Sequence, residues 1–306
     1  MNLKQIIMEN NNQSKKGSID RILVPIDFSD YSLNACFFAL HLSARTDAEI
    51  LLFHVFFNPM VDAMAFPDAF TYQSNMADIF KDLEQNAEKQ MKKFSKKIKR
   101  YAGLKNLKDI KITTEVKAGQ PGEEIDNIIK SFGPGIIVIG TRGHGEQSGE
   151  TLGSVAARVI DTAGIPVLLV TRDARLKEKG EIKLLYATDF DESDYQSIDS
   201  LTKILSGYSI KIECVHFSTG ANSKNNSGKM AEMKTHFLKT HKKLSLECHI
   251  IESKNLLQGV NDFIEANDIE LIALTHKKRN IFYRLFNPSL AKKLLFQTKR
   301  PVFVFN

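Results

Sequence analysis

The chain has 306 residues, of which 42% are hydrophobic and 25% are charged. These fractions are those of an ordinary globular chain, and they exclude a largely disordered protein. No run approaches the roughly 18 consecutive apolar residues of a membrane helix, and the first residues lack the apolar core of a signal peptide. We therefore expect a cytoplasmic protein without a membrane partner, with two domains of roughly 150 residues each.

The net charge of +6 is concentrated near the C-terminal end of the sequence. Residues 271–306 contain no Asp or Glu, and they carry eight basic side chains: Lys277, Lys278, Arg279, Arg284, Lys292, Lys293, Lys299 and Arg300. A solvated basic surface and an anionic partner both fit this segment. Because no nucleic-acid-binding motif accompanies the charge, we favour the solvated surface and expect no nucleic-acid partner.

Strand and helix patterns alternate along the first half of the chain. After a polar lead-in, apolar strands are expected near residues 21–26, 49–55, 110–117, 135–140 and 166–170. Amphipathic helices are expected between them, near residues 29–44, 80–98, 121–132 and 152–163. Ser29 is a suitable N-cap for the first helix. Since strands that are apolar on both faces suit a parallel sheet covered by helices, the pattern predicts a doubly wound α/β domain with five parallel strands.

The same pattern restarts in the second half. The interval from Gly140 to Pro166 is 26 residues, and the interval between the corresponding Thr275 and Pro301 is also 26 residues. Equal intervals between matching strand ends indicate an internal duplication, so two Rossmann-like domains are expected in tandem. The expected division is a flexible lead-in, a first domain, a charged linker and a second domain, at residues 1–19, 20–173, 174–181 and 182–306.

A glycine-rich segment follows the fourth strand at its carboxyl end. It reads Gly140-Thr-Arg-Gly143-His-Gly145-Glu-Gln-Ser-Gly149-Glu-Thr-Leu-Gly153-Ser154 and leads into a helix. Open parallel sheets bind ligands in this crevice, where glycine backbone and a helix N-terminus favour an anion. The expected ligand therefore bears phosphate. The segment is not a GxxxxGK[ST] loop, and no GxGxxG follows the first strand, so the two standard nucleotide motifs are excluded.

The spacing of three of these glycines is stronger evidence for a particular kind of site than the number of glycines in the segment. Gly140-x2-Gly143-x9-Gly153-Ser154 resembles the G-2x-G-9x-G-[S/T] signature of ATP-binding universal stress proteins. The first strand, Leu23-Val-Pro25-Ile-Asp27-Phe-Ser29, and the segment Leu52-Phe-His-Val55 resemble the same family. The resemblance covers all five strands of the first half, and with the duplication it implies a tandem member with adenine nucleotide alpha hydrolase-like domains.

The resemblance implies a nucleotide site made of nine residues: Pro25, Asp27, Val55, Ile139, Gly140, Gly143, Gly153, Ser154 and Val155. Asp27 would accept hydrogen bonds from the ribose or the adenine edge, and Val55 would flank the adenine. The two later glycines, with the serine and valine that follow them, would hold the phosphates. From the residues alone, Asp27 also fits a helix cap or dipole partner, and Val55 also fits the core.

Charged residues within the glycine-rich segment depart from a simple phosphate cradle. Glu146 and Glu150 would repel a triphosphate, unless they point to solvent or help to hold a divalent cation such as Mg²⁺. Arg142 and His144 are candidate donors to phosphate, and both also fit ordinary exposed loop positions.

The second half departs much further from the signature. Asp189 and Ser289 keep the positions of Asp27 and Ser154. Three glycines are replaced, with Thr275, Lys278 and Pro288 at the positions of Gly140, Gly143 and Gly153. Side chains then occupy the space that backbone needs to approach a phosphate, and proline removes an N–H donor. We therefore expect this half not to bind ATP and to serve as a scaffold.

The expected function is that of an ATP-binding stress-response regulator, which changes conformation or partner with bound nucleotide. The resemblance implies pairing through the last strands, residues 166–170 and 301–305, as a pseudo-dimer within the chain, or a homodimer of two chains. Two alternatives stay open: a slow ATP hydrolase, for which no positioned base is identifiable, and a nucleotide-independent interaction scaffold. The protein partner is unknown.

Two further features have several explanations. The Met and Phe residues between positions 58 and 72 fit core, a lid over the nucleotide, or a partner surface. Cys36, Cys214 and Cys248 are odd in number and far apart in sequence, so we expect small core residues rather than a disulfide framework or a zinc site.

Overall fold

The computed structural model describes residues 19–58, 73–107, 109–143, 152–175, 177, 180–218, 225–241, 244–276 and 299–306, with the backbone alone at 73–75. The first half contributes five strands: β1 (Arg21–Pro25), β2 (Glu49–Phe56), β3 (Ile112–Ala118), β4 (Ile136–Gly140) and β5 (Val167–Val170). Its helices are α2 (Asp30–Thr46), α4 (Gln73–Leu104), α5 (Pro121–Phe132) and α6 (Ser154–Thr162). They alternate with the strands in the expected order.

The second half repeats this series of elements. Its strands are β6 (Ile182–Ala187), β7 (Ile210–Ser218), β8 (Ser245–Glu252), β9 (Leu271–Thr275) and β10 (Val302–Phe305). Its helices within the described residues are α7 (Glu192–Ile204), α8 (Asn226–Thr240) and α9 (Leu256–Ala266). The clearest difference in length is between α4, with 32 residues, and its counterpart α8, with 15.

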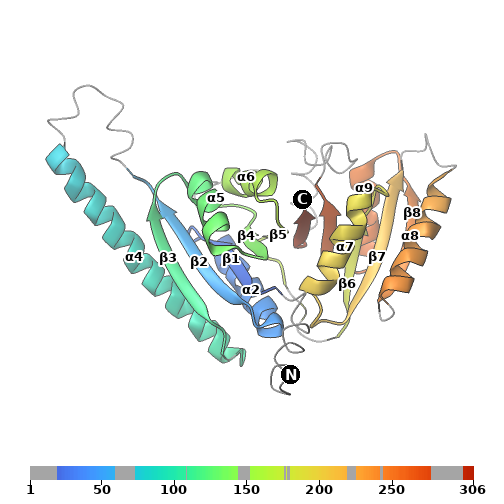
Figure 1. Cartoon of the computed structure of the whole chain (residues 1–306), viewed down its shortest axis with the longest axis horizontal. Helices are drawn as coiled ribbons and strands as arrows, with labels where there is room; N and C mark the ends of the chain where they lie inside the picture. Colours follow the sequence, from blue (N-terminus) through green and yellow to red (C-terminus); the bar gives the residue numbers. More distant parts are fainter. Residues whose placement is uncertain are drawn as a thin grey trace, which may run out of the picture.

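All ten strands form one continuous sheet in the order β3-β2-β1-β4-β5-β10-β9-β6-β7-β8 (Figure 1). Within each half every strand pair is parallel, and the two halves have the same order when each is read outward from the centre. The expected doubly wound fold is therefore confirmed in both halves.

Two apolar cores lie on opposite faces of this sheet. One packs beneath α2, α4, α7 and α8, and the other packs beneath α5, α6 and α9. In β1, Val24 contributes to the first core and Leu23 to the second, and both are fully buried. Burial on both faces explains why the strands are almost continuously apolar in sequence.

The two halves meet where β5 and β10 pair in antiparallel orientation. Leu168 lies opposite Phe303, and Val167 lies opposite Val304. This pairing confirms the expected association of the two last strands within one chain. It joins two edges that would otherwise present unpaired N–H and C=O groups.

Contacts outside the sheet also connect the halves. Arg45 of α2 donates to the carbonyl of Gly207 at 2.6 Å, and its guanidinium lies 4.2 Å from the centre of the Tyr208 ring. The Tyr208 hydroxyl in turn donates to the carbonyl of His41 at 2.9 Å. The second half is therefore bonded to α2 as well as to β5.

Several sequence-based expectations fall outside the described residues. These are the lead-in up to residue 18, the Met and Phe segment at 59–72, and most of the basic segment, 277–298. Among the described helices, none combines the length and the apolar character that crossing a bilayer requires.

Replacing Phe303 with alanine tests the β5–β10 junction. Phe303 is 1% exposed, so Phe303→Ala should lower the free energy of unfolding by about 3–5 kcal/mol, because a buried ring is lost at the junction. Urea denaturation followed by circular dichroism measures this. Leu238 on α8 is 46% exposed, and the control Leu238→Ala should stay within about 1 kcal/mol of wild type. Equal losses in the two variants would contradict the prediction.

Candidate functional site

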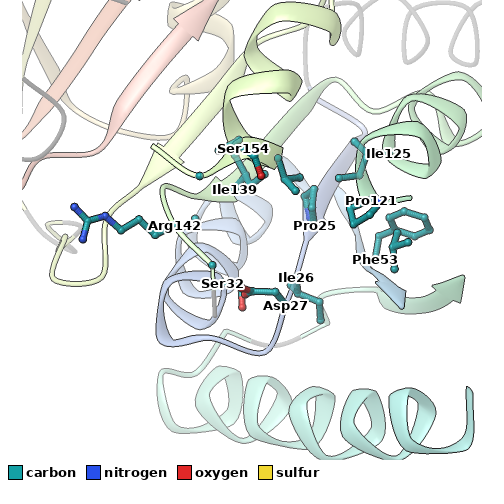
Figure 2. Close-up of a pocket in the computed structure, with 16 residues that line it drawn as sticks. Pro25, Ile26, Asp27, Ser32, Phe53, Pro121, Ile125, Ile139, Arg142 and Ser154 are labelled. Carbon is teal, nitrogen blue, oxygen red and sulfur yellow. The ribbon is translucent and has the colours of Figure 1, made fainter. Parts of the chain in front are cut away.

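A cavity of about 370 Å³ opens at the carboxyl ends of β1, β2 and β4 (Figure 2). The first residues of α5 and α6 complete its walls. Its lining is mainly apolar, with a few polar groups from Asp27, Ser32, Arg142 and Ser154. An apolar pocket with a small number of polar groups, at the end of a parallel sheet, is the usual form of a small-molecule site.

All nine residues that the family resemblance assigns to nucleotide line this cavity: Pro25, Asp27, Val55, Ile139, Gly140, Gly143, Gly153, Ser154 and Val155. The fold thus brings together segments that are more than a hundred residues apart in sequence. That these residues contact a nucleotide stays a prediction.

Six further lining residues were not identified from the sequence: Ile26, Ser32, Phe53, Pro121, Ile125 and Ala156. Pro121 and Ile125 belong to the first turns of α5, which starts just beyond the carboxyl end of β3. The expected helix at 121–132 could have identified these two residues, because helices that follow parallel strands begin at the edge of the sheet where ligands bind.

Asp27 both bonds to the N-terminal cap of α2 and lines the cavity. Its Oδ1 accepts hydrogen bonds from the Ser29 backbone N–H at 3.1 Å and from the Ser29 hydroxyl at 2.6 Å. Ser29 Oγ accepts from the Ser32 N–H at 3.2 Å, which confirms Ser29 as the N-cap of α2. Asp27 therefore orders the cap residue, and it also lines the cavity.

The three signature glycines differ in how closely protein atoms surround them. A Cβ on Gly140 would lie 2.8 Å from the Cβ of Tyr31, so this glycine lets β4 approach α2 closely. A Cβ on Gly143 would lie 2.7 Å from Oδ2 of Asp27. At Gly153 the nearest atoms would be 3.5 Å away, an ordinary contact. Packing against the backbone of α2 therefore accounts for Gly140. At Gly143 the close atom is the end of a side chain that can move, and no described protein atom requires glycine at position 153.

The N-terminal end of α6 borders the cavity without a side-chain cap. Gly153 is its N-cap residue, and within the described residues no side chain accepts a hydrogen bond there. The first turn of α6 also contains no acidic residue. Since the first N–H groups of a helix need acceptors and carry partial positive charge, this end is suited to an anion.

The structure places only part of the charged segment. Figure 2 shows the Arg142 guanidinium pointing away from the other labelled side chains, although the residue lines the cavity. His144, Glu146 and Glu150 lie outside the described residues. Their proposed roles at phosphate or a cation stay predictions.

A histidine supports the loop that carries Asp27. His54 Nδ1 donates to the carbonyl of Ile26 at 2.8 Å, and its ring lies 4.2 Å from the ring of Phe28. Phe28 itself has a backbone φ of 65°, a conformation that residues other than glycine rarely adopt. Burial lowers the pKa of His54 below its usual 6.5, which keeps the imidazole neutral.

The second half retains this framework. His216 Nδ1 donates to the carbonyl of Thr188 at 2.8 Å, and its ring lies 4.4 Å from that of Phe190. Phe190 has a φ of 62°. Because the same loop geometry occurs in both halves, it belongs to the fold rather than to one ligand site.

The interior beneath the second loop is different. The buried Asp194 carboxylate accepts from the hydroxyls of Thr188 at 2.7 Å and Tyr186 at 3.1 Å. The Tyr186 hydroxyl also shares a hydrogen bond of 2.8 Å with Thr275, and Thr275 donates to Ser197 at 2.9 Å. These hydrogen bonds join the five side chains in one buried polar network.

Each member of this network corresponds to a smaller or less polar residue of the first half, when the two halves are aligned by strand register and by the N-caps of α2 and α7. The pairs are Tyr186 with Val24, Thr188 with Ile26, Asp194 with Ser32, Ser197 with Ala35, and Thr275 with Gly140. Thr275 is therefore one of five correlated differences between the halves, and two of the others, Tyr186 and Ser197, are hydrogen-bond partners of its hydroxyl.

One cluster among the described residues has the composition of a metal site. Glu213, Glu247 and His249 bring ligand atoms within 4.8 Å of one another. The ammonium of Lys211 lies 2.9 Å from Glu213 and 2.7 Å from Glu247, so an ammonium group of the protein already forms ion pairs with both carboxylates. We assign no metal to this cluster.

Comparison with known proteins decides the family. A model described as the universal stress protein family matches residues 18–171, half of the chain. The chain belongs to the universal stress protein family. The match covers the half that contains the cavity and the complete glycine signature.

Individual universal stress proteins agree with this assignment. The chain is 32% identical over 173 residues to one from Methanocaldococcus jannaschii, which covers 56% of this chain and 89% of that protein. It is 29% identical over 151 residues to one from Bacillus subtilis, which covers 49% and 98%. The crystal structure of a universal stress protein from Archaeoglobus fulgidus matches 94% of this chain and 96% of its own, with a TM-score of 0.63 and 18% identity. This last similarity supports the tandem fold alone.

The pKa of His54 makes a prediction about acid stability. An unfolded chain binds a proton at His54 more readily than the folded chain, so the stabilising contribution is complete above pH 6.5 and is lost as the pH falls below it. In His54→Asn, an amide can still donate to Ile26 and does not titrate. Melting temperatures measured from about pH 7.5 to about pH 5.5 should therefore fall less steeply in this variant. His236→Asn, at an exposed position, is the control, and a wild-type slope in His54→Asn would contradict the prediction.

Proposed function

We propose that this universal stress protein binds ATP, with Mg²⁺, in the first-half cavity and acts as a nucleotide-dependent cytoplasmic regulator of the stress response. The observation that carries the proposal is the agreement between the family resemblance and the geometry, since all nine residues that the resemblance assigns to nucleotide line one cavity. Apolar walls fit a base, and the uncapped start of α6 fits phosphate.

The cavity suggests a role for each group. Adenine would lie against Val55 and Ile139, with Asp27 accepting a hydrogen bond from the ribose or the base. Ser154, through its hydroxyl and backbone N–H, would donate to phosphate at the start of α6. Bound Mg²⁺ would supply charge neutralisation between phosphates, and the uncapped helix end fits the anionic complex.

The second half would act as a scaffold that does not bind nucleotide. Its network of Tyr186, Asp194 and Thr275 fills the corresponding interior with groups that already have partners. We propose the division into a first domain at residues 20–173, a linker at 174–181 and a second domain at 182–306. Because β5 and β10 already pair with each other, a homodimer would form through other surfaces.

Thermal unfolding with and without Mg-ATP tests the proposal on the full chain. Nucleotide that binds only the folded chain should stabilise it by about 2.7 kcal/mol at a hundredfold excess over its dissociation constant. Gly153→Val should abolish the shift, because it adds bulk where phosphate would approach while leaving ordinary packing space within the chain. Calorimetric titration should give one nucleotide per chain.

Gly103 on α4 provides a matched control. A Cβ there would have no neighbour within 4 Å, so Gly103→Val should retain the full ATP-dependent shift. No shift in nucleotide-free wild type, or an equal shift in Gly153→Val, would reject the first-half site. Two nucleotides per chain would reject the scaffold role, and ADP released in excess of bound nucleotide would identify the hydrolase alternative.

A further inference from the structure

Two cysteines that are distant in sequence lie side by side in the second half. Cys214 on β7 is directly opposite Cys248 on β8 in the parallel register. Directly opposed residues of parallel strands point to the same face, and the strands are about 4.8 Å apart. Such a separation falls within the Cα range of disulfides, about 4.4–6.8 Å. All three cysteines are free thiols in the structure, as expected, but the fold aligns two positions that are far apart in sequence.

The two thiols differ in access. Cys214 is fully buried, and its sulfur lies 3.6 Å from the sulfur of Met233 on α8. Cys248 is half-buried, and it lies on β8, the last strand of the sheet. Cys248 is therefore the more accessible of the two thiols, and Cys214 has no exposed surface.

The pKa values of the two thiols also differ, and the more accessible Cys248 has the lower one. The interaction with the neighbouring Cys214 thiol lowers the pKa of Cys248, burial opposes this, the nearby Lys234 ammonium adds to the lowering, and the Glu213 carboxylate opposes it. The same interaction, together with burial, raises the pKa of Cys214. Since the thiolate is the reactive form, Cys248 has the character of an attacking group and Cys214 that of a resolving thiol.

We infer that Cys214 and Cys248 form a redox site, in which peroxide oxidises the accessible thiol and the buried thiol closes a disulfide. The Cys248 thiolate attacks one oxygen of hydrogen peroxide, and the O–O bond breaks to give a sulfenic acid and hydroxide. The Cys214 sulfur then attacks the Cys248 sulfur and displaces the hydroxyl group, which leaves as water with the Cys214 proton. Two thiols and one peroxide thus give one disulfide and two waters.

The first half carries no equivalent of the pair. Leu52 and Thr114 occupy the corresponding positions on β2 and β3. The inference therefore concerns a property of the second half alone, and it is independent of whether the first half binds ATP.

Peroxide treatment of the reduced full chain tests the inference. Intact mass should fall by two hydrogens, a non-reducing peptide map should contain a bond between Cys214 and Cys248, and dithiothreitol should reverse both changes. Iodoacetamide should modify Cys248 at least about tenfold faster than Cys36, which is fully buried and has a raised pKa.

Two variants assign the steps. In Cys214→Ala the reaction should stop at a sulfenic acid on Cys248, detected by dimedone labelling, and Cys36→Ala should form the disulfide as wild type does. If Cys214→Ala does not fold, Cys248→Ser at the sheet edge replaces it, and Cys214 should then stay a free thiol. The inference is overturned if both thiols survive peroxide that fully oxidises glutathione in the same tube. It is also overturned if the new bond joins two chains or involves Cys36.

Discussion

Main-chain pairing between β5 and β10 is the interaction on which the molecule's architecture depends. Each half alone would end in a strand whose N–H and C=O groups lack partners on one side. The antiparallel match of Leu168 with Phe303 removes both edges and makes one ten-stranded sheet. Contacts from Arg45 to Gly207 and Tyr208 then fix α2 against the other half. The cavity is built on strands that this junction holds in place.

The two halves show which features belong to the fold and which belong to a site. The loop with a left-handed phenylalanine and a supporting histidine occurs in both halves, so it is part of the common framework. The cavity with an uncapped helix start is described in the first half, and a closed network around Asp194 occupies the second. The two copies therefore differ in the described interior beneath a shared loop framework.

Local patterns in the sequence predicted much of the fold. Apolar strands, the cap at Ser29, the helix at 121–132 and the repeat could all be identified, because each depends on neighbouring residues or on spacing along the chain. The family resemblance also identified nine lining residues of the cavity. Phe53 and Ile125 were missed, because their places in the wall depend on how elements pack. The opposition of Cys214 and Cys248 depends on strand register, which composition and spacing do not specify.

The network around Thr275 also bears on the history of the duplication. Thr275 stands where Gly140 lies against α2 in the other copy, so the threonine requires more room between strand and helix. Once Tyr186 and Ser197 had acquired bonds to that hydroxyl, a return to glycine alone would remove one hydrogen bond from each of them and open a void between them. Divergence of the second copy has therefore become contingent on several residues together, and no single substitution reverses it.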